Sequence, residues 1–286
     1  MTEKIEVITS DEVVHDIDTC VVWGVDGPNG MLTVPAKRGS NLVVPGTHGE
    51  LHIPAKKYGA ANLVLQMWVR GVNPDGTIPA DGDARRVFVE NLRELVAIFT
   101  VDEQVTLRHT LSDGSAREIT GEVTDVIEPD ITGWGRWSLG RFAVGLNCAH
   151  PFWSDPDPVQ SFAASGAPTL LTEFAGMTAP VEDLLITFGP QSNPRLEQPS
   201  TGIWVRINRV IEPGQTITID TSTWEVYGTG GVAGGLYEDL EYGGRGTTRW
   251  FALSPEPSGA PIVELTETSG GGGTVTITGK RKYKIG

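Results

Sequence analysis

Alternating apolar and polar residues recur along the first half of the chain and predict β-strands. Each run is enriched in β-branched or aromatic residues and is bounded by turn-forming Gly, Pro, Asn and Asp. The predicted strands cover residues 4–8, 19–25, 41–46, 50–55, 62–72, 104–111, 117–127 and 137–148. Asp113-Gly114 stands between two of these runs, and this dipeptide predicts a β-hairpin.

One segment of the first half, residues 83–102, has the period of a helix instead. Its apolar residues recur at intervals of three and four, which places them on one helical face. They are Phe88, Leu92, Leu95, Val96 and Phe99. Asp83 is the predicted N-cap, and Asp81 precedes the same end. We expect the apolar face to pack on a sheet, because no other part of this region is predicted to be helical.

A domain boundary is predicted near residues 150–160, where three prolines occur in eight residues (Pro151, Pro156 and Pro158). Proline lacks a backbone donor and restricts the preceding residue, so no helix or central strand is expected here. We therefore divide the chain into domains 1–155 and 156–286. Short strands in the second domain predict an antiparallel sandwich or jelly roll. They cover residues 183–189, 202–208, 215–220, 223–228, 247–254, 262–268 and 274–279.

Glycine is concentrated in two stretches of the second domain, residues 228–246 and 269–273. Such stretches are typical of mobile surface loops rather than packed structure. Glycine and proline together contribute 55 of the 286 residues, which favours many turns and short strands. The fold class predicted from these patterns is mainly β.

The charge balance excludes some functions. The chain has 22 basic and 36 acidic residues and a formal net charge of −14. A general nucleic-acid binder or a protein that adheres to anionic membranes needs clustered basic residues instead. The start of the chain lacks a signal peptide, and no apolar run approaches the roughly 18 residues of a membrane helix. We therefore expect a soluble protein made in a cytoplasm.

No residue set predicts catalysis, a cofactor or a metal. His48 and His52 flank Glu50 in a predicted turn and strand, where i and i+4 lie roughly 13 Å apart, too far to share one metal ion. The glycine motif at 228–233 has no predicted helix after it to bind a dinucleotide. Two further groups, the carboxylate pairs Asp155/Asp157 and Glu128/Asp130, are expected to be solvated turns beside prolines. We therefore predict that the protein is not an enzyme.

The remaining candidate functional residues are the two cysteines and the aromatic residues of the second half. Cys20 and Cys148 are expected to be buried, reduced thiols. Several aromatic residues could form a surface that stacks against sugars: Trp204, Trp224, Tyr227, Tyr237, Tyr242 and Trp250. The three tryptophans lie in alternating runs, which favours core packing. Tyr237 and Tyr242 lie in the Gly-rich stretch, where exposure and contact with a partner protein or a sugar are expected.

The order of several segments resembles the distal tail proteins, also labelled minor tail proteins, of long-tailed bacteriophages with flexible tails. The first half contributes residues 37–59, residues 63–76, the Asn91-Leu92-x-x-Leu95 helix and the Pro151-Phe152-Trp153 element. The second half contributes residues 186–228, which include the strand Gly214 to Asp220, and residues 249–268 and 274–286. The resemblance covers nearly the whole chain. One departure is the turn from Leu253 to Ala260, which is lengthened.

The resemblance implies a structural protein of the virion tail tip or baseplate, assembled in the host cytoplasm. Family members form a hexameric ring through an N-terminal β-barrel-like domain with one helix, and a galectin-like C-terminal sandwich faces outward. Implied partners are other copies of the chain, the tail tube protein, the tape-measure protein and the tip hub, with no membrane. DNA passes through the lumen without specific binding. An alternative function is a carbohydrate-binding module whose C-terminal sandwich contacts host cell-wall saccharide.

Overall fold

The computed structural model describes residues 3–38, 42–43, 50–51, 57–80, 83–100, 104–126, 130–132, 139–232, 234–244, 250–268 and 272–286. Strands predominate in these residues and one α-helix is present, which confirms the predicted mainly β fold. The chain divides into two compact units. Unit 1 comprises Met1–Trp153 and Lys284–Gly286, and unit 2 comprises Ser154–Tyr283.

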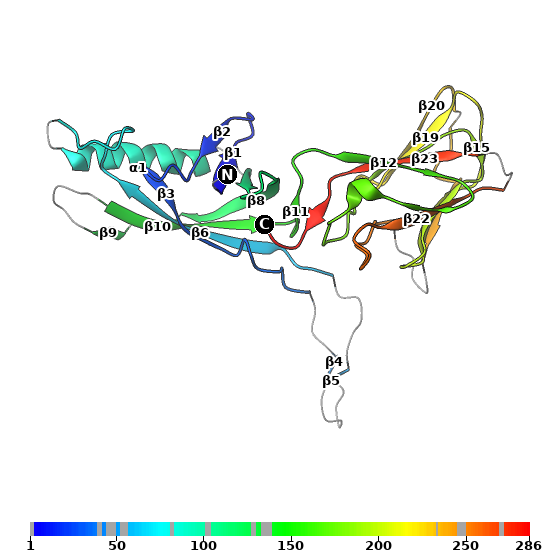
Figure 1. The fold of residues 1–286 in the computed structure, drawn as a ribbon, viewed down its shortest axis with the longest axis horizontal. Helices are drawn as coiled ribbons and strands as arrows, with labels where there is room; N and C mark the ends of the chain where they lie inside the picture. The colour runs from blue at the N-terminus through cyan, green and yellow to red at the C-terminus, as the bar shows by residue number, and fades with distance from the viewer. Residues whose placement is uncertain are drawn as a thin grey trace. The chain divides into compact units, whose positions relative to one another are not determined.

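Unit 1 is built on a large antiparallel sheet (Figure 1). Its main hydrogen-bonded path, in spatial order, is β2 (Val14–Asp16), β1 (Lys4–Ile8), β7 (Gln104–Thr110), β8 (Ala116–Val126), β10 (Leu139–Cys148), β6 (Ala61–Arg70) and β3 (Trp23–Asn29). β9 (Asp130–Thr132) pairs with β10, and β4 (Leu42–Val43) pairs with β5 (Glu50–Leu51). The hairpin predicted at Asp113-Gly114 joins β7 to β8 and is confirmed.

The predicted helix is α1 (Ala84–Thr100), and its predicted N-cap is confirmed. The backbone N–H of Arg86 donates to the Asp83 carboxylate at 3.0 Å. The buried face is slightly rotated from the predicted one, because Leu92 and Val96 are only half-buried. The buried residues are Ala84, Val87, Phe88, Asn91, Leu95, Ile98 and Phe99. As expected, α1 packs on the sheet, where it contacts β6 and β8.

The contact between α1 and β6 depends on one polar residue and one glycine. Asn91 is buried, and its side-chain amide donates to the carbonyl oxygens of Arg70 at 2.8 Å and Val72 at 3.0 Å, at the end of β6. A Cβ atom at Gly71 would lie 2.0 Å from the carbonyl oxygen of Ala84. The start of the helix therefore approaches the end of β6 more closely than any side chain at position 71 would allow.

The expected barrel-like closure of the first domain is not seen. In the described part of the chain, the strand path of unit 1 ends at β2 on one side and at β3 on the other, so the sheet is open. The alternating burial of β6 shows why closure is unnecessary for a core. One face of the strand is buried and the other is largely exposed, and α1 covers apolar residues that barrel closure would otherwise enclose.

Unit 2 contains two five-stranded antiparallel sheets, as predicted for a sandwich (Figure 1). The β12–β20 sheet has the order β12 (Val159–Ala164), β23 (Thr274–Gly279), β14 (Leu185–Phe188), β19 (Thr216–Asp220) and β20 (Glu225–Thr229). The β13–β21 sheet has the order β13 (Pro168–Leu170), β22 (Ile262–Thr266), β16 (Arg195–Gln198), β17 (Ile203–Ile207) and β21 (Leu240–Gly243). Both sheets contribute to one apolar core, for example through Ile186, Ile219, Val205 and Leu265.

The remaining elements of the described structure are short strands and one 3₁₀ turn. The short strands β15 (Gln191–Ser192) and β18 (Val210–Ile211) pair with each other in unit 2. A 3₁₀ turn, η1 (Thr172–Phe174), buries Phe174. β11 (Trp153–Ser154) and β24 (Lys282–Tyr283) lie at the two positions where the chain passes between the units.

Part of the first Gly-rich stretch is packed structure, which corrects the prediction of a mobile loop at 228–246. β21 lies inside this stretch and pairs with β17 from Trp204↔Gly243 to Ile207↔Leu240. Leu240 packs against the core, and a Cβ atom at Gly243 would lie 3.1 Å from the Trp204 ring. Gly243 therefore leaves room for the Trp204 ring beside β21, and this part of the stretch is a paired strand rather than a mobile loop. In the second stretch, residues 269–271 lie outside the described residues.

The strand predicted at 247–254 is not present in the described part of that segment, residues 250–254. The only β-type pairing of residues 250–254 is an isolated bridge between Val181 and Leu253. The lengthened turn that follows is held by polar contacts. The buried amide of Gln198 donates to the Ser254 carbonyl and to the Glu256 carboxylate, and Glu256 also accepts from the backbone N–H of Ile262.

Asp155 is buried, whereas the sequence predicts that it lies in a solvated turn. Its side chain is buried, forms an ion pair with Arg281 and accepts a hydrogen bond from the Tyr283 hydroxyl at 3.0 Å. Asp157 is exposed, as expected. The interaction joins the first and last segments of unit 2, which are far apart in sequence, and no local pattern could have indicated it.

Candidate interaction surface

The described residues contain no group of three or more His, Cys, Asp or Glu side chains that could hold a metal ion. His48, His52, Glu128 and Ala233 lie outside the described residues, as do the side chains of Glu50 and Asp130. β20 extends into the glycine motif at Gly228 and Thr229, and no helix follows it in residues 230–232 and 234–244. The described part of this motif therefore offers no helix N-terminus for a dinucleotide phosphate.

The two cysteines differ, and Cys20 corrects the expectation that both are buried. Cys148 is buried, and burial raises its pKa to about 11. Cys20 is exposed in the loop between β2 and β3. Partial desolvation and the Asp18 carboxylate raise the pKa of the Cys20 thiol. Thiols with a raised pKa are poor nucleophiles, because the thiolate is the reactive form.

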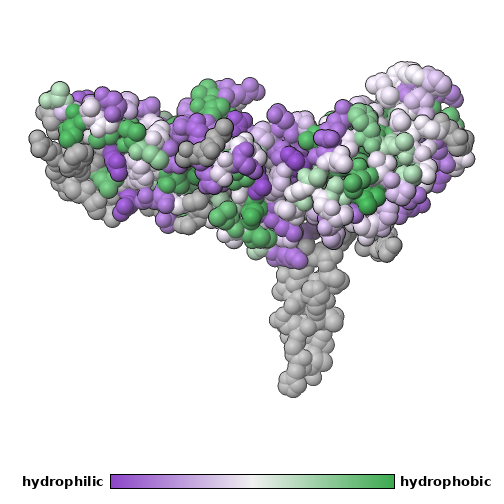
Figure 2. Space-filling model, viewed as in Figure 1, coloured by the Kyte–Doolittle hydropathy of each residue, from purple (hydrophilic) through white to green (hydrophobic). Residues whose placement is uncertain are grey.

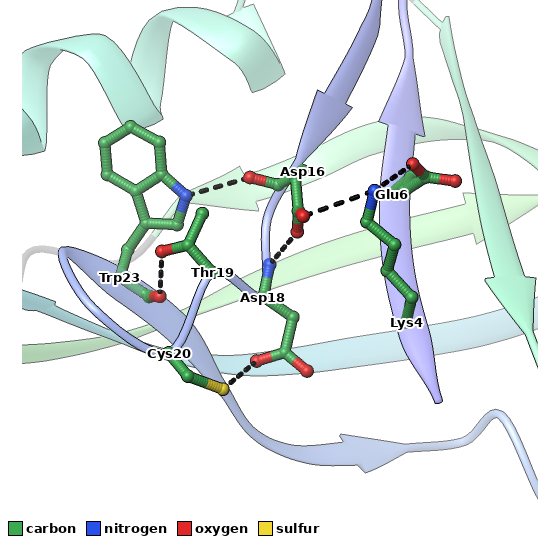
Figure 3. Close-up of polar contacts among 7 residues, drawn as sticks. All are labelled: Lys4, Glu6, Asp16, Asp18, Thr19, Cys20 and Trp23. Atoms are coloured by element: carbon green, nitrogen blue, oxygen red, sulfur yellow. Dashed lines mark hydrogen bonds and ion pairs between the residues drawn. The ribbon is translucent and has the colours of Figure 1, made fainter. Parts of the chain in front are cut away.

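The loop that carries Cys20 is fixed by local hydrogen bonds (Figure 3). The Trp23 indole N–H donates to the Asp16 carbonyl oxygen at 3.0 Å, and the Thr19 hydroxyl donates to the Trp23 carbonyl oxygen at 2.9 Å. Cys20 Sγ lies 3.6 Å from the Asp18 carboxylate. The backbone of Cys20 has a positive φ of 58°. These contacts hold the loop beside the edge strand β2.

Four aromatic side chains of unit 2 form a cluster that we name the aromatic surface: Trp224, Tyr237, Tyr242 and Trp250. The rings of Trp224 and Trp250 are stacked, with centroids 4.6 Å apart and planes inclined by 20°. Tyr242 contacts Trp250 edge-on at 4.8 Å. The Tyr237 hydroxyl donates to the Trp224 carbonyl oxygen at 3.0 Å. The structure therefore brings together residues separated by up to 26 positions in the sequence.

The exposure of these aromatic side chains agrees with the sequence-based predictions for the tyrosines but not for Trp224. Tyr237 and Tyr242 are exposed, as expected. Trp224 was expected in the core, but it is 54% exposed in the turn between β19 and β20. Trp250 is half-buried and packs against the core of unit 2. Trp204 is half-buried, and the Arg195 guanidinium lies 4.6 Å from the centroid of its ring. The positive φ of Trp224, 65°, belongs to a turn and could not be read from an alternating pattern.

The outward face of the β12–β20 sheet is a second distinctive surface. Its middle row across the five strands contains no charged side chain: Phe162, Thr276, Thr187, Thr218 and Tyr227. Phe162 and Tyr227, at the two ends of the row, are exposed. The row is uncharged although the chain has a net charge of −14, whereas the next row on the same face includes Asp220 and Glu225.

The hydrophobic residues visible in Figure 2 form separate patches among hydrophilic ones. None of the helices in the described residues has the length and hydrophobicity needed to cross a membrane. Exposed apolar residues also occur on an edge strand of unit 1, where Val14 of β2 and the preceding Val13 are exposed. Edge strands with exposed apolar side chains can pair with another chain.

No family model matches the chain, and no curated protein matches its sequence. Solved structures do match. The crystal structure of the Dit protein of phage SPP1 aligns with a TM-score of 0.59 and 13% identity, and the alignment covers 98% of this chain and 99% of that chain. That protein is described as a paradigm of the hub adsorption apparatus in phages that infect Gram-positive hosts. This chain therefore shares the fold of the SPP1 Dit protein over nearly its whole length.

Two further structures are similar at a lower level. They are chains of the phage p2 baseplate in its activated conformation, with Sr and with Ca. Both alignments cover the whole of each chain at 10% identity, with TM-scores of 0.44 and 0.43.

Proposed function

We propose that this protein is a structural component of a phage tail tip, where it forms a ring between the tail tube and the tip hub. The observation that supports this most strongly is the fold shared with the SPP1 Dit protein along both units. A fold alone does not define a function. Here it agrees with the ordered sequence resemblance to distal tail proteins and with a chain in which no catalytic set is predicted.

In the proposed ring, six copies associate through residues 1–155, and residues 156–286 lie at the periphery. A ring closes when one patch on each subunit binds a different patch on the next subunit under a repeated rotation. β2 and β3 are the ends of the unit 1 strand path, and Val13 and Val14 expose apolar area beside one of them. We propose that the β2 edge contributes to the contact between neighbouring copies.

The proposed ring surrounds the path of the DNA, and the tail tube, tape-measure and hub proteins are its neighbours. The acidic balance of 36 carboxylates against 22 basic residues supports passage of DNA without adhesion. In the proposed ring, carboxylates near the lumen repel phosphate. In this proposal the protein performs no catalysis and is located in the virion.

Native mass spectrometry and negative-stain microscopy test the ring. Six copies of the 30.7 kDa chain give a particle of about 184 kDa. Assembly depends on protomer concentration, so the protein is measured at about 50 μM. A particle of this mass with a central hole is the expected result. A strict monomer, both alone and when mixed with the neighbouring tail proteins, would contradict the proposal.

Edge variants test which surface closes the ring. Val13→Lys combined with Val14→Lys places charge on the β2 edge and is expected to shift the protein to monomers. Val64→Lys is the matched control, because Val64 is also exposed but lies on β6, which is paired on both sides. A control that disassembles the ring as fully as the edge variant would exclude the β2 edge as the specific contact.

A further inference from the structure

Trp224 combines strain with exposure. Its φ of 65° lies in the left-handed region, which bulky residues rarely adopt, and its side chain is 54% exposed. Glycine or asparagine would fit this turn without strain. Folding gains little from an aromatic ring that stays in contact with water. Strained residues persist where the surrounding structure fixes them, and they are concentrated at functional sites.

The neighbours of Trp224 hold its ring in one orientation. Trp250 stacks on it at 4.6 Å and itself packs against the core of unit 2. The Tyr237 hydroxyl binds the Trp224 carbonyl oxygen, and Tyr242 packs edge-on against Trp250. Because Trp250 covers part of the Trp224 ring, the exposed remainder is presented to solvent in a fixed position. A ligand that stacks on a pre-organised ring loses less conformational entropy on binding.

Two exposed carboxylates lie close to the aromatic surface in the sequence. Glu225 follows Trp224 in the sequence and Glu238 follows Tyr237, and both side chains are exposed. Neither carboxylate makes an ion pair with the residues that the structure describes. Ionised carboxylates accept hydrogen bonds from hydroxyl groups and repel anions. The Trp250 indole N–H is buried and has no hydrogen-bond acceptor in the described part of the chain.

This combination matches the chemistry of a neutral sugar. A pyranose presents C–H bonds on one face, which pack against the electron-rich face of an indole, and hydroxyl groups around its rim, which donate to carboxylates. A phosphate or sulfate group would be repelled by Glu225 and Glu238. A protein partner would bury Tyr237 and Tyr242 as well, whereas a single sugar residue stacked on Trp224 needs only the one exposed ring.

We propose that the aromatic surface binds a neutral saccharide, with Trp224 stacked on one sugar ring and Glu225 and Glu238 accepting hydrogen bonds from its hydroxyl groups. Tyr237 and Tyr242 act as positioning residues that fix Trp224 and Trp250. The proposed contact thus moves from the two tyrosines that the sequence indicated to a tryptophan that it assigned to the core. Saccharide binding goes beyond the assembly role and does not require the ring.

The test uses the full chain on an array of neutral and anionic oligosaccharides. The neutral set contains N-acetylglucosamine, glucose and galactose oligomers, and the anionic set contains hyaluronan and sulfated oligomers. The best neutral oligomer is then titrated by calorimetry. Trp224→Ala and Trp224→Gly are expected to weaken binding by about tenfold or more. Tyr237→Phe, which keeps the ring and removes the hydroxyl, is expected to weaken binding several-fold.

Tyr227→Ala is the matched control, because Tyr227 is an exposed aromatic residue on β20 that makes no ring contact with the aromatic surface in the described residues. It is expected to bind normally. Trp224→Gly removes both the ring and the strain, so its thermal melting shows that lost binding is not lost folding. Four results would overturn the proposal: no binding to the neutral set, preference for the anionic set, full binding by Trp224→Ala, or an equal loss in Tyr227→Ala. Dissociation of an oligomer by Trp224→Ala without any sugar binding would assign the surface to protein contact instead.

Discussion

Replacing Asn91 tests whether two hydrogen bonds hold α1 on the sheet of unit 1. The Asn91 amide serves the carbonyl oxygens of Arg70 and Val72, and the residue is only 9% exposed. A buried acceptor that loses its donor costs roughly 1–3 kcal/mol. Two such acceptors would cost roughly 2–6 kcal/mol, and water that reaches part of the site after the change offsets some of this, so we expect Asn91→Ala to destabilise unit 1 by about 2–4 kcal/mol. For a unit of about 150 residues, this corresponds to a decrease in melting temperature of roughly 4–16 °C.

Urea denaturation and calorimetry of the full chain measure this effect, with the transition of unit 1 analysed separately from that of unit 2. Asn91→Leu keeps the branched shape and the number of side-chain heavy atoms but supplies no donor, so it should lose about as much stability as Asn91→Ala. Asn73→Ala is the matched control, because the Asn73 amide makes an exposed hydrogen bond with the Thr77 hydroxyl. Its expected cost is below about 0.5 kcal/mol. If Asn91→Leu were as stable as the unmodified protein, packing rather than hydrogen bonding would hold the helix.

Two further predictions concern ionisable groups. Burial lowers the pKa of His109 and Arg117 lowers it further, against the opposing effect of Glu3, so the unfolded chain takes up a proton more readily than the folded one. The free energy of unfolding should therefore decrease as the pH falls from about 7 to about 5.5, and His109→Asn should remove this part of the decrease in a urea series. Partial burial acts to raise the pKa of Glu256, but its hydrogen bonds outweigh this and lower the pKa below its usual value. Glu256→Ala should destabilise unit 2 by roughly 1–3 kcal/mol, while Glu212→Ala, at an exposed position, should not; equal melting temperatures for the two variants would contradict this.

Local patterns determined much of the secondary structure. Alternation along β6 and β10 and the Asp113-Gly114 turn each depend on neighbouring residues, and the structure confirms them. The same is true of α1 and its Asp83 cap. The presence of a helix follows from its period, but which of its apolar residues are most buried depends on the sheet below it. Leu92 is therefore half-buried, and Asn91 takes a buried position that a scale of hydrophobicity would not assign to it.

The sequence by itself determined a mainly β chain with one amphipathic helix and no recognisable catalytic set, because these features depend on residue type and short-range spacing. Only the tertiary structure decided that the sheet of unit 1 stays open, that Asp155 is paired with Arg281, and that β21 lies within a Gly-rich stretch. The aromatic surface also forms only in the tertiary structure, because it depends on the backbone conformation of Trp224 and on its stacking against Trp250, 26 positions away. Contacts of this kind form between segments distant in sequence, so their energy depends on the packed fold and leaves no periodic signal in the chain.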